Sequence, residues 1–346
     1  MKTKSIFFSA AAISAAAFSA SFAFAAPAPS PVSGGSIDFA AAFGSQVTVD
    51  QAYPSCVTNT VDRKRVVTPP TPGANCNIRP DEQKIAIYSI KLCRNKPSAP
   101  SLDAVSDLSS CQAIFDSTNS AGSEVSIKFD ETTALTNGTV RVPDAGTYTH
   151  LYVELNPEVK IKTSARFNIK MASTNGNSVG AYCWSKQANT YNFASNRQGS
   201  LPDATECGSS AATTFDATSV FFNSLSDDSD SGGTGFVTTM TNIPTTATTL
   251  DTAATLDAFL IGIDSKLVAQ QLVNTMGDVK RLVGVITLPN GGVTVNAATT
   301  GLVIGYNNTL GSQISTQSGV NPSRISKFGN GPFDATVTTV PPAPPG

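Results

Sequence analysis

The segment Gly176-Asn-Ser178-Val-Gly180 matches the G-x-S-x-G pattern, which places a nucleophilic serine on a sharp turn between a strand and a helix. Here the residues that follow are Ala-Tyr-Cys-Trp, which are typical of a strand, so a hairpin turn is the simpler interpretation. The chain has one histidine, His150, and it precedes the serine, whereas this class of hydrolase places it last. We therefore predict no catalytic residue and no cofactor, and we expect His150 to be a hydrogen-bonded structural residue or a surface residue.

Asp227, Asp228 and Asp230 form the one acidic cluster, and Gly232 follows them. Carboxylates of this kind are the ligands that calcium prefers. The spacing departs from the D-x-D-x-D-G pattern of known calcium loops, and no glutamate closes the segment. Two interpretations stay open, a calcium site and a solvated hinge.

A glycan-binding surface would need exposed aromatic rings, and four tyrosines are candidates for it: Tyr148, Tyr152, Tyr182 and Tyr191. The single tryptophan, Trp184, follows Cys183 in a strand-like segment. Tryptophan packed against a disulfide is a common core arrangement in β-sandwiches, so we expect Trp184 in the core.

The chain contains six cysteines: Cys56, Cys76, Cys93, Cys111, Cys183 and Cys207. An even number in an exported chain indicates disulfides, and six cysteines allow fifteen pairings. We favour Cys56–Cys76, Cys93–Cys111 and Cys183–Cys207, because each pair brackets one loop-like polar segment. Closing a loop of about 20 residues stabilises a fold by about 3 kcal/mol in the chain-entropy model. A metal site is the competing interpretation, but the chain lacks C-x-x-C and has one histidine.

The elements that must position these residues are mostly strands. Apolar and polar residues alternate with period two in short segments separated by turn signals, which predicts a mainly β fold of one or two antiparallel sandwich-like modules. The predicted strands are Gln46–Asp50, Lys84–Leu92, Glu124–Asp130, Thr139–Val142, His150–Leu155, Val159–Met171, Ser219–Leu225, Gly235–Thr241, Ala258–Ile263, Val279–Leu288, Val293–Asn296 and Leu302–Tyr306. Residues 56–80 are rich in proline and glycine, and we expect them to be irregular.

One short helix is predicted near residues 265–276, because Asp264 and Ser265 can cap it and Gly277 can end it. Two octapeptides, at 135–142 and 288–295, place Asn-Gly between alternating segments, which predicts type I′ hairpins. Their similarity has two open explanations, duplication of a β module or the shared chemistry of tight turns.

The amino-terminal residues have a basic start, an apolar stretch and an Ala-x-Ala site, which predict a signal peptide over residues 1–25; a membrane anchor is the alternative. We expect the organisation to continue as a leader at 26–35, an N-terminal module at 36–225, a hinge at 226–235, a C-terminal module at 236–330 and a Pro-rich tail at 331–346. Beyond the signal peptide no transmembrane segment is expected.

Composition narrows the possible partners. The formal net charge is −2, and removal of Lys2 and Lys4 with the signal peptide would bring it to −4. Only 14% of the residues are charged and no basic stripe occurs, so we expect no nucleic-acid partner.

The segments Ile85–Cys93, Cys111 and Gly146–Leu155 carry the pattern Y-x-I-x-L-C, a second cysteine, and Gly-Thr-Tyr-Thr at a strand entry. This pattern resembles a loose group of uncharacterised exported bacterial β-rich proteins, over roughly residues 84–185. The resemblance implies a cell-envelope or extracellular setting and supports a Cys93–Cys111 bridge. It implies no catalytic residue.

Together these observations predict an exported, non-enzymatic structural or interaction protein of the bacterial cell envelope or surface, whose partner is an unknown protein or glycan. A glycan- or calcium-binding extracellular module is the alternative. A secreted hydrolase, whose carboxylates meet only in the folded chain, is the second alternative.

Overall fold

The computed structural model describes most of the chain from residue 37 onward. The described residues are 37–41, 57–61, 64–69, 75–128, 132–187, 204–221, 237–241, 244–246, 249–250, 255–268, 279–307, 311–317, 322–330 and 334–341. The predicted signal peptide, leader and hinge lie outside these ranges, as do Cys56, Tyr191 and the three clustered aspartates.

The largest sheet is built around β5 (Glu82–Cys93), a twelve-residue strand. Two shorter antiparallel strands follow one another along each side of it: β6 (Cys111–Ser117) and β7 (Ser123–Lys128) on one side, β11 (His150–Leu155) and β12 (Glu158–Lys162) on the other. The other five strands of this ten-stranded sheet are β9 (Gly138–Val140), β16 (Thr218–Phe221), β17 (Val237–Thr241), β20 (Thr255–Ile261) and β21 (Arg281–Thr287).

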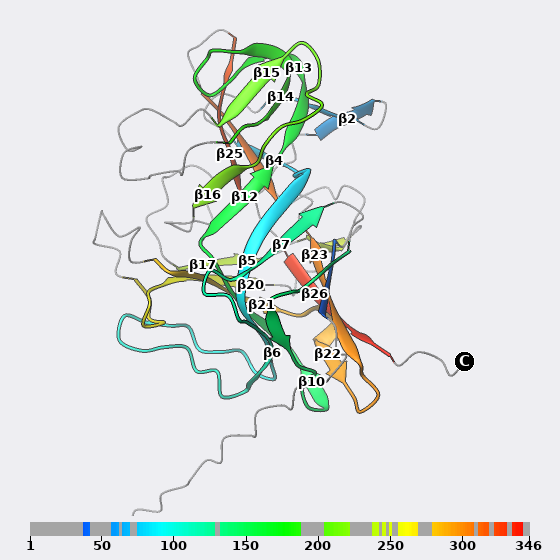
Figure 1. The fold of residues 1–346 in the computed structure, drawn as a ribbon, viewed down its shortest axis with the longest axis vertical. Helices are drawn as coiled ribbons and strands as arrows, with labels where there is room; N and C mark the ends of the chain where they lie inside the picture. The colour runs from blue at the N-terminus through cyan, green and yellow to red at the C-terminus, as the bar shows by residue number, and fades with distance from the viewer. Residues whose placement is uncertain are drawn as a thin grey trace, which may run out of the picture.

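A second, eight-stranded sheet forms the upper lobe in Figure 1. Its strands are β15 (Thr205–Gly208), β14 (Val179–Ser185), β13 (Ser164–Ala172), β25 (Arg324–Asn330), β24 (Ser312–Gln317) and β4 (Asn75–Ile78) in spatial order, with β3 (Lys64–Val67) beside β13 and β2 (Val57–Val61) beside β3. The chain passes from β12 through Thr163 directly into β13, and this passage connects the lobe to the ten-stranded sheet.

A third sheet has four strands in the order β26 (Asp334–Val340), β23 (Gly301–Asn307), β1 (Ile37–Ala41) and β8 (Thr132–Ala134). Two smaller pairs complete the described strands: β10 (Gly146–Tyr148) with β22 (Val293–Val295), and β18 (Pro244–Thr246) with β19 (Thr249–Leu250).

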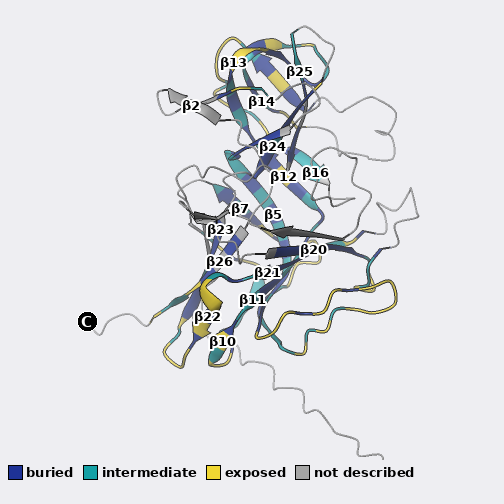
Figure 2. Ribbon diagram, turned by 180° about the vertical axis from the view of Figure 1, so that it is seen from behind, coloured by how far each residue is buried: buried dark blue, intermediate teal, exposed yellow. Residues whose placement is uncertain are grey.

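The main core contains buried residues of both the ten-stranded and the four-stranded sheets. Stretches of these strands are dark blue, the colour of buried residues, in Figure 2. Residues of β5 such as Ile85, Ile87 and Ile90 are buried in the same cluster as Leu302 and Ile304 of β23. The upper lobe has its own core, which contains Phe167, Met171, Ile314, Ile325 and Phe328. Each core excludes water from one face of a sheet, as alternating strands require.

The predicted mainly β, antiparallel, sandwich-like fold is confirmed. The described residues contain no α-helix. The predicted helix is wrong at its beginning, because Leu267 forms an antiparallel bridge with Ile261 instead. Residues 269–278, the rest of that segment, lie outside the described residues.

Three expected boundaries differ from the structure. The strands β2, β3 and β4 lie within residues 56–80, which the sequence predicted to be irregular. Strand β26 lies within the predicted Pro-rich tail and pairs with β23 along its whole length. Strands of the two predicted modules also share sheets, since β11 pairs with β21 and β13 pairs with β25.

The two Asn-Gly segments form turns but not hairpins. Asn137 and Asn290 both have the positive φ expected, at 57° and 56°. The flanking strands, however, pair elsewhere: β8 with β1, β9 with β6, β21 with β11 and β20, and β22 with β10. The asparagines therefore turn the chain from one sheet to another.

Two of the favoured disulfides are confirmed, and both join residues directly opposite on neighbouring strands. Cys93 of β5 is bonded to Cys111 of β6, and Cys183 of β14 to Cys207 of β15. Cys76 is disulfide-bonded as well, while its predicted partner, Cys56, lies outside the described residues. No cysteine in the described ranges is free.

Candidate functional site

The loop closed by Cys93–Cys111, residues 94–110, is here called the stapled loop. The two Cα atoms at its base are 3.9 Å apart, so both ends of the loop leave from one point on the sheet. The loop packs against the outer face of the ten-stranded sheet, on the side away from the main core. Beneath it lies a small third core of Cys93, Tyr152, Phe259, Ile261, Val283 and Val285, against which Leu108, Cys111 and Leu267 pack.

Several interactions besides the disulfide fix the path of the stapled loop. Pro97 and Pro100 are buried. The Leu267 amide donates to the Ser101 carbonyl oxygen at 3.0 Å, which joins the loop to the turn after β20. The Lys96 ammonium lies 2.6 Å from an Asp257 carboxylate oxygen on β20. The loop is therefore attached to the sheet at several separate points.

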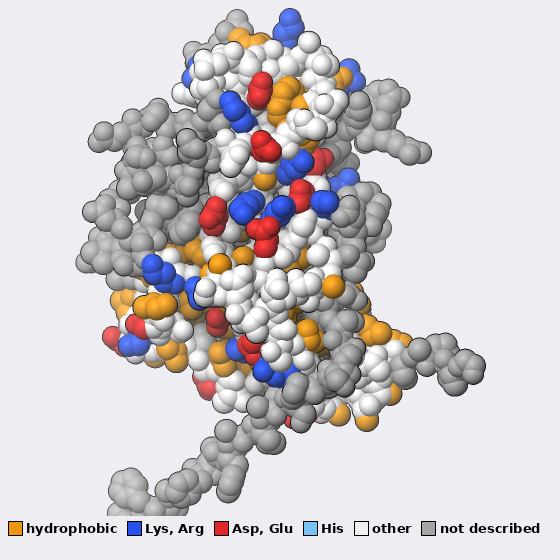
Figure 3. Space-filling model, viewed as in Figure 1, with side chains coloured by type: hydrophobic (Ala, Val, Ile, Leu, Met, Phe, Trp, Pro, Cys, Tyr) orange, Lys and Arg blue, Asp and Glu red, His pale blue; other side chains and the backbone are white. Residues whose placement is uncertain are grey.

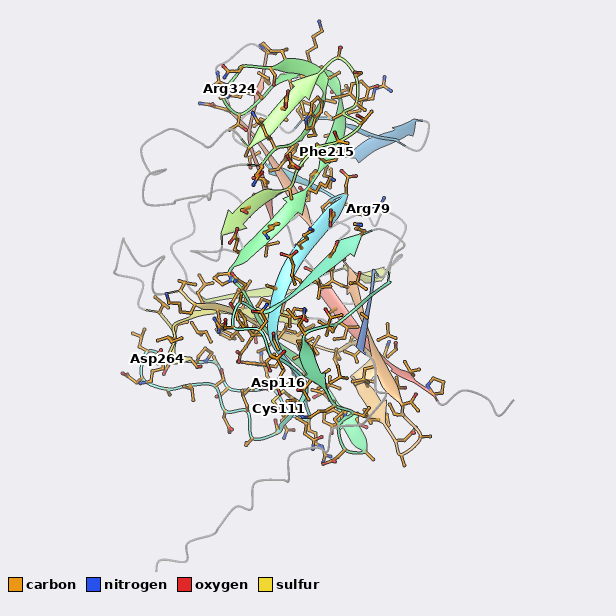
Figure 4. All side chains as sticks on the ribbon, in the orientation of Figure 1. Arg79, Cys111, Asp116, Phe215, Asp264 and Arg324 are labelled. Carbon is orange, nitrogen blue, oxygen red and sulfur yellow. A yellow bond between two sulfur atoms is a disulfide. The ribbon has the colours of Figure 1, made fainter. Side chains whose placement is uncertain are left out.

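The stapled loop nevertheless carries exposed apolar side chains. Leu102 is 56% exposed and Val105 is 51% exposed, and Ile263 in the adjoining turn is 82% exposed. That turn is closed by the Gly262 amide, which donates to the Lys266 carbonyl oxygen at 2.9 Å. In Figure 4, Cys111 marks the base of the loop and Asp264 marks this turn. We call Leu102, Val105 and Ile263 the apolar tip.

Acidic residues border the apolar tip. Asp103, Asp107 and Asp264 are all exposed and lie within two residues of its members. A hydrogen bond from the Ser109 amide, 2.9 Å long, is the largest influence on Asp107 and lowers the pKa of its carboxyl group. The same two segments therefore carry both the apolar tip and the exposed aspartates next to it in sequence, which we call the acidic rim. Figure 3 shows apolar side chains gathered on this side of the lower lobe, with charged atoms beside them.

Two of the four predicted ligand tyrosines are buried, so the prediction is wrong for them. Tyr148 lies in the main core, and its hydroxyl is 2.8 Å from both the Gln112 Oε1 atom and the Asp144 carbonyl oxygen. Tyr152 lies in the core under the stapled loop and donates to Glu154 at 2.9 Å. Burial raises the pKa of both phenols. Each ring is large and apolar with one polar group, which a hydrogen bond satisfies inside a core.

Tyr182 and Trp184 occupy the outer face of β14, and we call this pair the aromatic face. Both are half-buried, whereas Cys183 between them points to the buried side with its disulfide. The sequence predicts that Trp184 packs against this disulfide, and that prediction is wrong. Neighbouring residues in a strand face opposite ways, so Trp184 and Cys183 lie on different faces of β14. The Arg166 guanidinium lies 5.7 Å from the centre of the Tyr182 ring.

The G-x-S-x-G segment is a hairpin turn, as the simpler interpretation predicted. Ala172 of β13 is opposite Val179 of β14, and the Ser178 hydroxyl accepts a hydrogen bond from the Cys207 amide at 2.9 Å. His150 lies on β11, in the other large sheet, where its Nδ1 is 2.8 Å from the Thr149 hydroxyl. The two residues of the proposed pair thus belong to separate parts of the fold.

The proposed calcium ligands and Tyr191 lie outside the described residues. Within the described ranges, no group of three or more His, Cys, Asp or Glu side chains is placed to hold a metal ion. The same part of the chain contains no helix that is long and apolar enough to cross a membrane. Comparison of the chain with known protein families, with curated proteins and with solved structures found no match.

The sequence did not single out the apolar tip. Leu102 and Val105 are isolated among serines and aspartates, so the sequence predicts only a polar loop there. Ile263 ends the predicted strand Ala258–Ile263, where an apolar side chain is normally buried. Only the fold places the three side chains on adjoining segments.

Proposed function

We propose that this chain is an exported, non-enzymatic interaction protein of the bacterial cell envelope or surface, and that it binds a partner protein through the apolar tip. The observation that supports this most is the exposure of three apolar side chains, two on the stapled loop and one in the adjoining turn, on segments that are otherwise fixed to the sheet. Exposed apolar groups rimmed by polar residues are typical of protein-binding sites. A loop held in one conformation loses little entropy on binding, which favours affinity.

The expected export is compatible with the disulfides, because such bonds form and persist outside the reducing cytosol. The predicted signal peptide and the resemblance to exported bacterial proteins support the same location. The acidic rim favours a partner with basic residues around an apolar pocket, since opposite charges speed association and orient the complex.

The test is binding of the purified, fluorescently labelled protein to washed cells of the producing strain from which its gene has been deleted. We expect saturable binding, and at least a tenfold loss of affinity for the L102D/I263D variant, because a buried carboxylate opposes an apolar contact. Val179→Asp is the matched control, since Val179 is 46% exposed in the other lobe.

Protease treatment of the cells distinguishes the partners. Loss of binding after protease supports a protein partner. Unchanged affinity of the L102D/I263D variant would contradict a role for the apolar tip.

Cell fractionation tests the location of the protein. We expect the native protein to stay with washed cells and to leave them on mild extraction. Recovery only from the medium would count against a surface role.

A second candidate function, glycan binding, is favoured by the aromatic face. Two rings two residues apart on one strand offer flat apolar surfaces for a sugar, and Arg166 beside them is a hydrogen-bond donor. We expect Tyr182→Ala or Trp184→Ala to abolish any signal on a glycan array. Tyr88→Ala, which alters a half-buried ring in the ten-stranded sheet, should leave that signal unchanged. Calcium binding and the secreted hydrolase remain predictions without a structural observation in their favour.

A further inference from the structure

Strand β1, the first of the described strands, occupies an interior position in its sheet. It lies inside the four-stranded sheet, parallel to β23 on one side and antiparallel to β8 on the other. Its register sets Ile37 beside Leu302, Phe39 beside Ile304 and Ala41 beside Tyr306. Strand β8 has no other partner strand among the described residues, so β1 alone joins it to the sheet.

The slot that β1 fills borders the main core. Leu302, Ile304 and Tyr306 are 1%, 1% and 3% exposed. An empty slot would leave two unpaired strand edges beside this core, and unpaired edges readily recruit another strand. The sequence that fits the slot is present on every copy of the chain.

β1 is synthesised long before β23, one of the two strands between which it lies. Among the described strands, β1 is the first to be made, and β23, which pairs with β1 along one edge, is among the last. Strands that are far apart in the sequence pair slowly. When pairing is slow, exchange of a strand between two copies of a chain is a characteristic outcome. The fifteen residues 42–56 that separate β1 from β2 can span about 50 Å when extended.

From these observations we propose that the slot between β23 and β8 also accepts β1 from a second copy of this chain. The contacts made in exchange are the same as those within one copy, so little is lost when a strand is traded. Because each copy would give its strand to one neighbour and receive a strand from another, the contact is head to tail and can extend through many copies.

The test uses two full-length chains with different affinity tags, produced together in one host. One carries Asp38→Cys in β1 and the other carries Val303→Cys, its register partner in β23. Neither chain can form the new bond within itself. We therefore expect a covalent heterodimer on a non-reducing gel after purification through both tags in turn.

The matched control replaces Val303→Cys with Thr338→Cys. Thr338 lies opposite Val303 on β26, one strand further from β1, which is too far for a disulfide with residue 38. Equal heterodimer yield with this control would overturn the proposal. A single chain carrying both D38C and V303C should form the bond internally, and failure to do so would contradict the register on which the proposal rests. Internal bonding without any heterodimer would show that the strand is not exchanged.

Discussion

At the scale of single residues, His150 shows how burial and neighbouring charges act on the pKa of one side chain. It lies half-buried at the start of β11, beside the stapled loop. Burial is the largest cause that lowers its pKa, and the nearby Lys96 ammonium lowers it further, while the Asp257 carboxylate acts in the opposite direction. Protonation of His150 is therefore less favourable in the folded chain than in the unfolded one.

This shift predicts a pH dependence with a definite sign. The pKa of His150 in the folded chain is below the unfolded value of about 6.5. The contribution of the neutral imidazole to the free energy of unfolding is therefore present above the unfolded pKa and is lost as the pH falls through the folded pKa. We expect the melting temperature of the wild-type protein to fall more between pH 7.5 and 5 than that of His150→Gln, measured at constant ionic strength. Lys96→Gln should retain most of the dependence, because burial is the larger cause. Equal slopes for the wild type and H150Q would refute this assignment.

At the scale of elements, the turn between β21 and β22 determines where the chain changes sheets. Gly291 and Gly292 have φ values of 79° and 104°. A methyl group on Gly291 would meet nothing within 4 Å, whereas on Gly292 it would lie 2.1 Å from the Tyr148 carbonyl oxygen. The first glycine is needed for its backbone conformation, and the second also for the close approach of β10.

These two positions form a matched pair for mutation. Gly291→Ala should destabilise the fold by about 1 kcal/mol, the cost of a positive φ with a side chain. Gly292→Ala should cost about 3 kcal/mol or more, because overpacking adds to that strain and displaces β10 from β22. Urea denaturation of both variants measures the difference. Equal effects would mean that the contact with Tyr148 does not constrain the turn.

At the scale of the whole molecule, a buried polar contact helps to join the two lobes. Thr163 lies between β12 and β13, and its hydroxyl donates to the Ser312 hydroxyl of β24 at 2.9 Å. Both residues are fully buried. Close by, the Ser164 amide donates to the Asp81 carboxylate at 2.6 Å, at the entry to β5.

Removal of one hydroxyl of the buried pair should weaken this junction. We expect Thr163→Val to lower the free energy of unfolding by about 1–3 kcal/mol, because the Ser312 hydroxyl then stays buried without its partner. The double variant T163V/S312A should be closer to the wild type, since neither position then carries an unpaired group. Chemical denaturation of the wild type, T163V, S312A and the double variant provides the check, and strict additivity of the two single changes would argue against a direct contact.

The sequence predicted which segments are strands much better than it predicted which strands pair with one another. Alternation identified strands such as β5, β11 and β21, and loop bracketing identified two disulfides, because both signals are local. The Asn-Gly turns had the expected backbone conformation at Asn137 and Asn290, yet their strands pair with segments far away in the chain. The burial of Tyr148 and Tyr152 was likewise not predictable, because the alternation within a strand does not reveal whether both faces of its sheet are covered.

The two ends of the described fold lie side by side. Ile37 at the start of β1 and Thr339 near the end of β26 both neighbour Leu302, so the polypeptide enters and leaves the four-stranded sheet at one pole. The eight-stranded sheet lies at the opposite pole in Figure 1. An attachment made next to β1 or next to β26 would therefore hold the molecule in the same orientation, with β14 and its residues Tyr182 and Trp184 at the distal end.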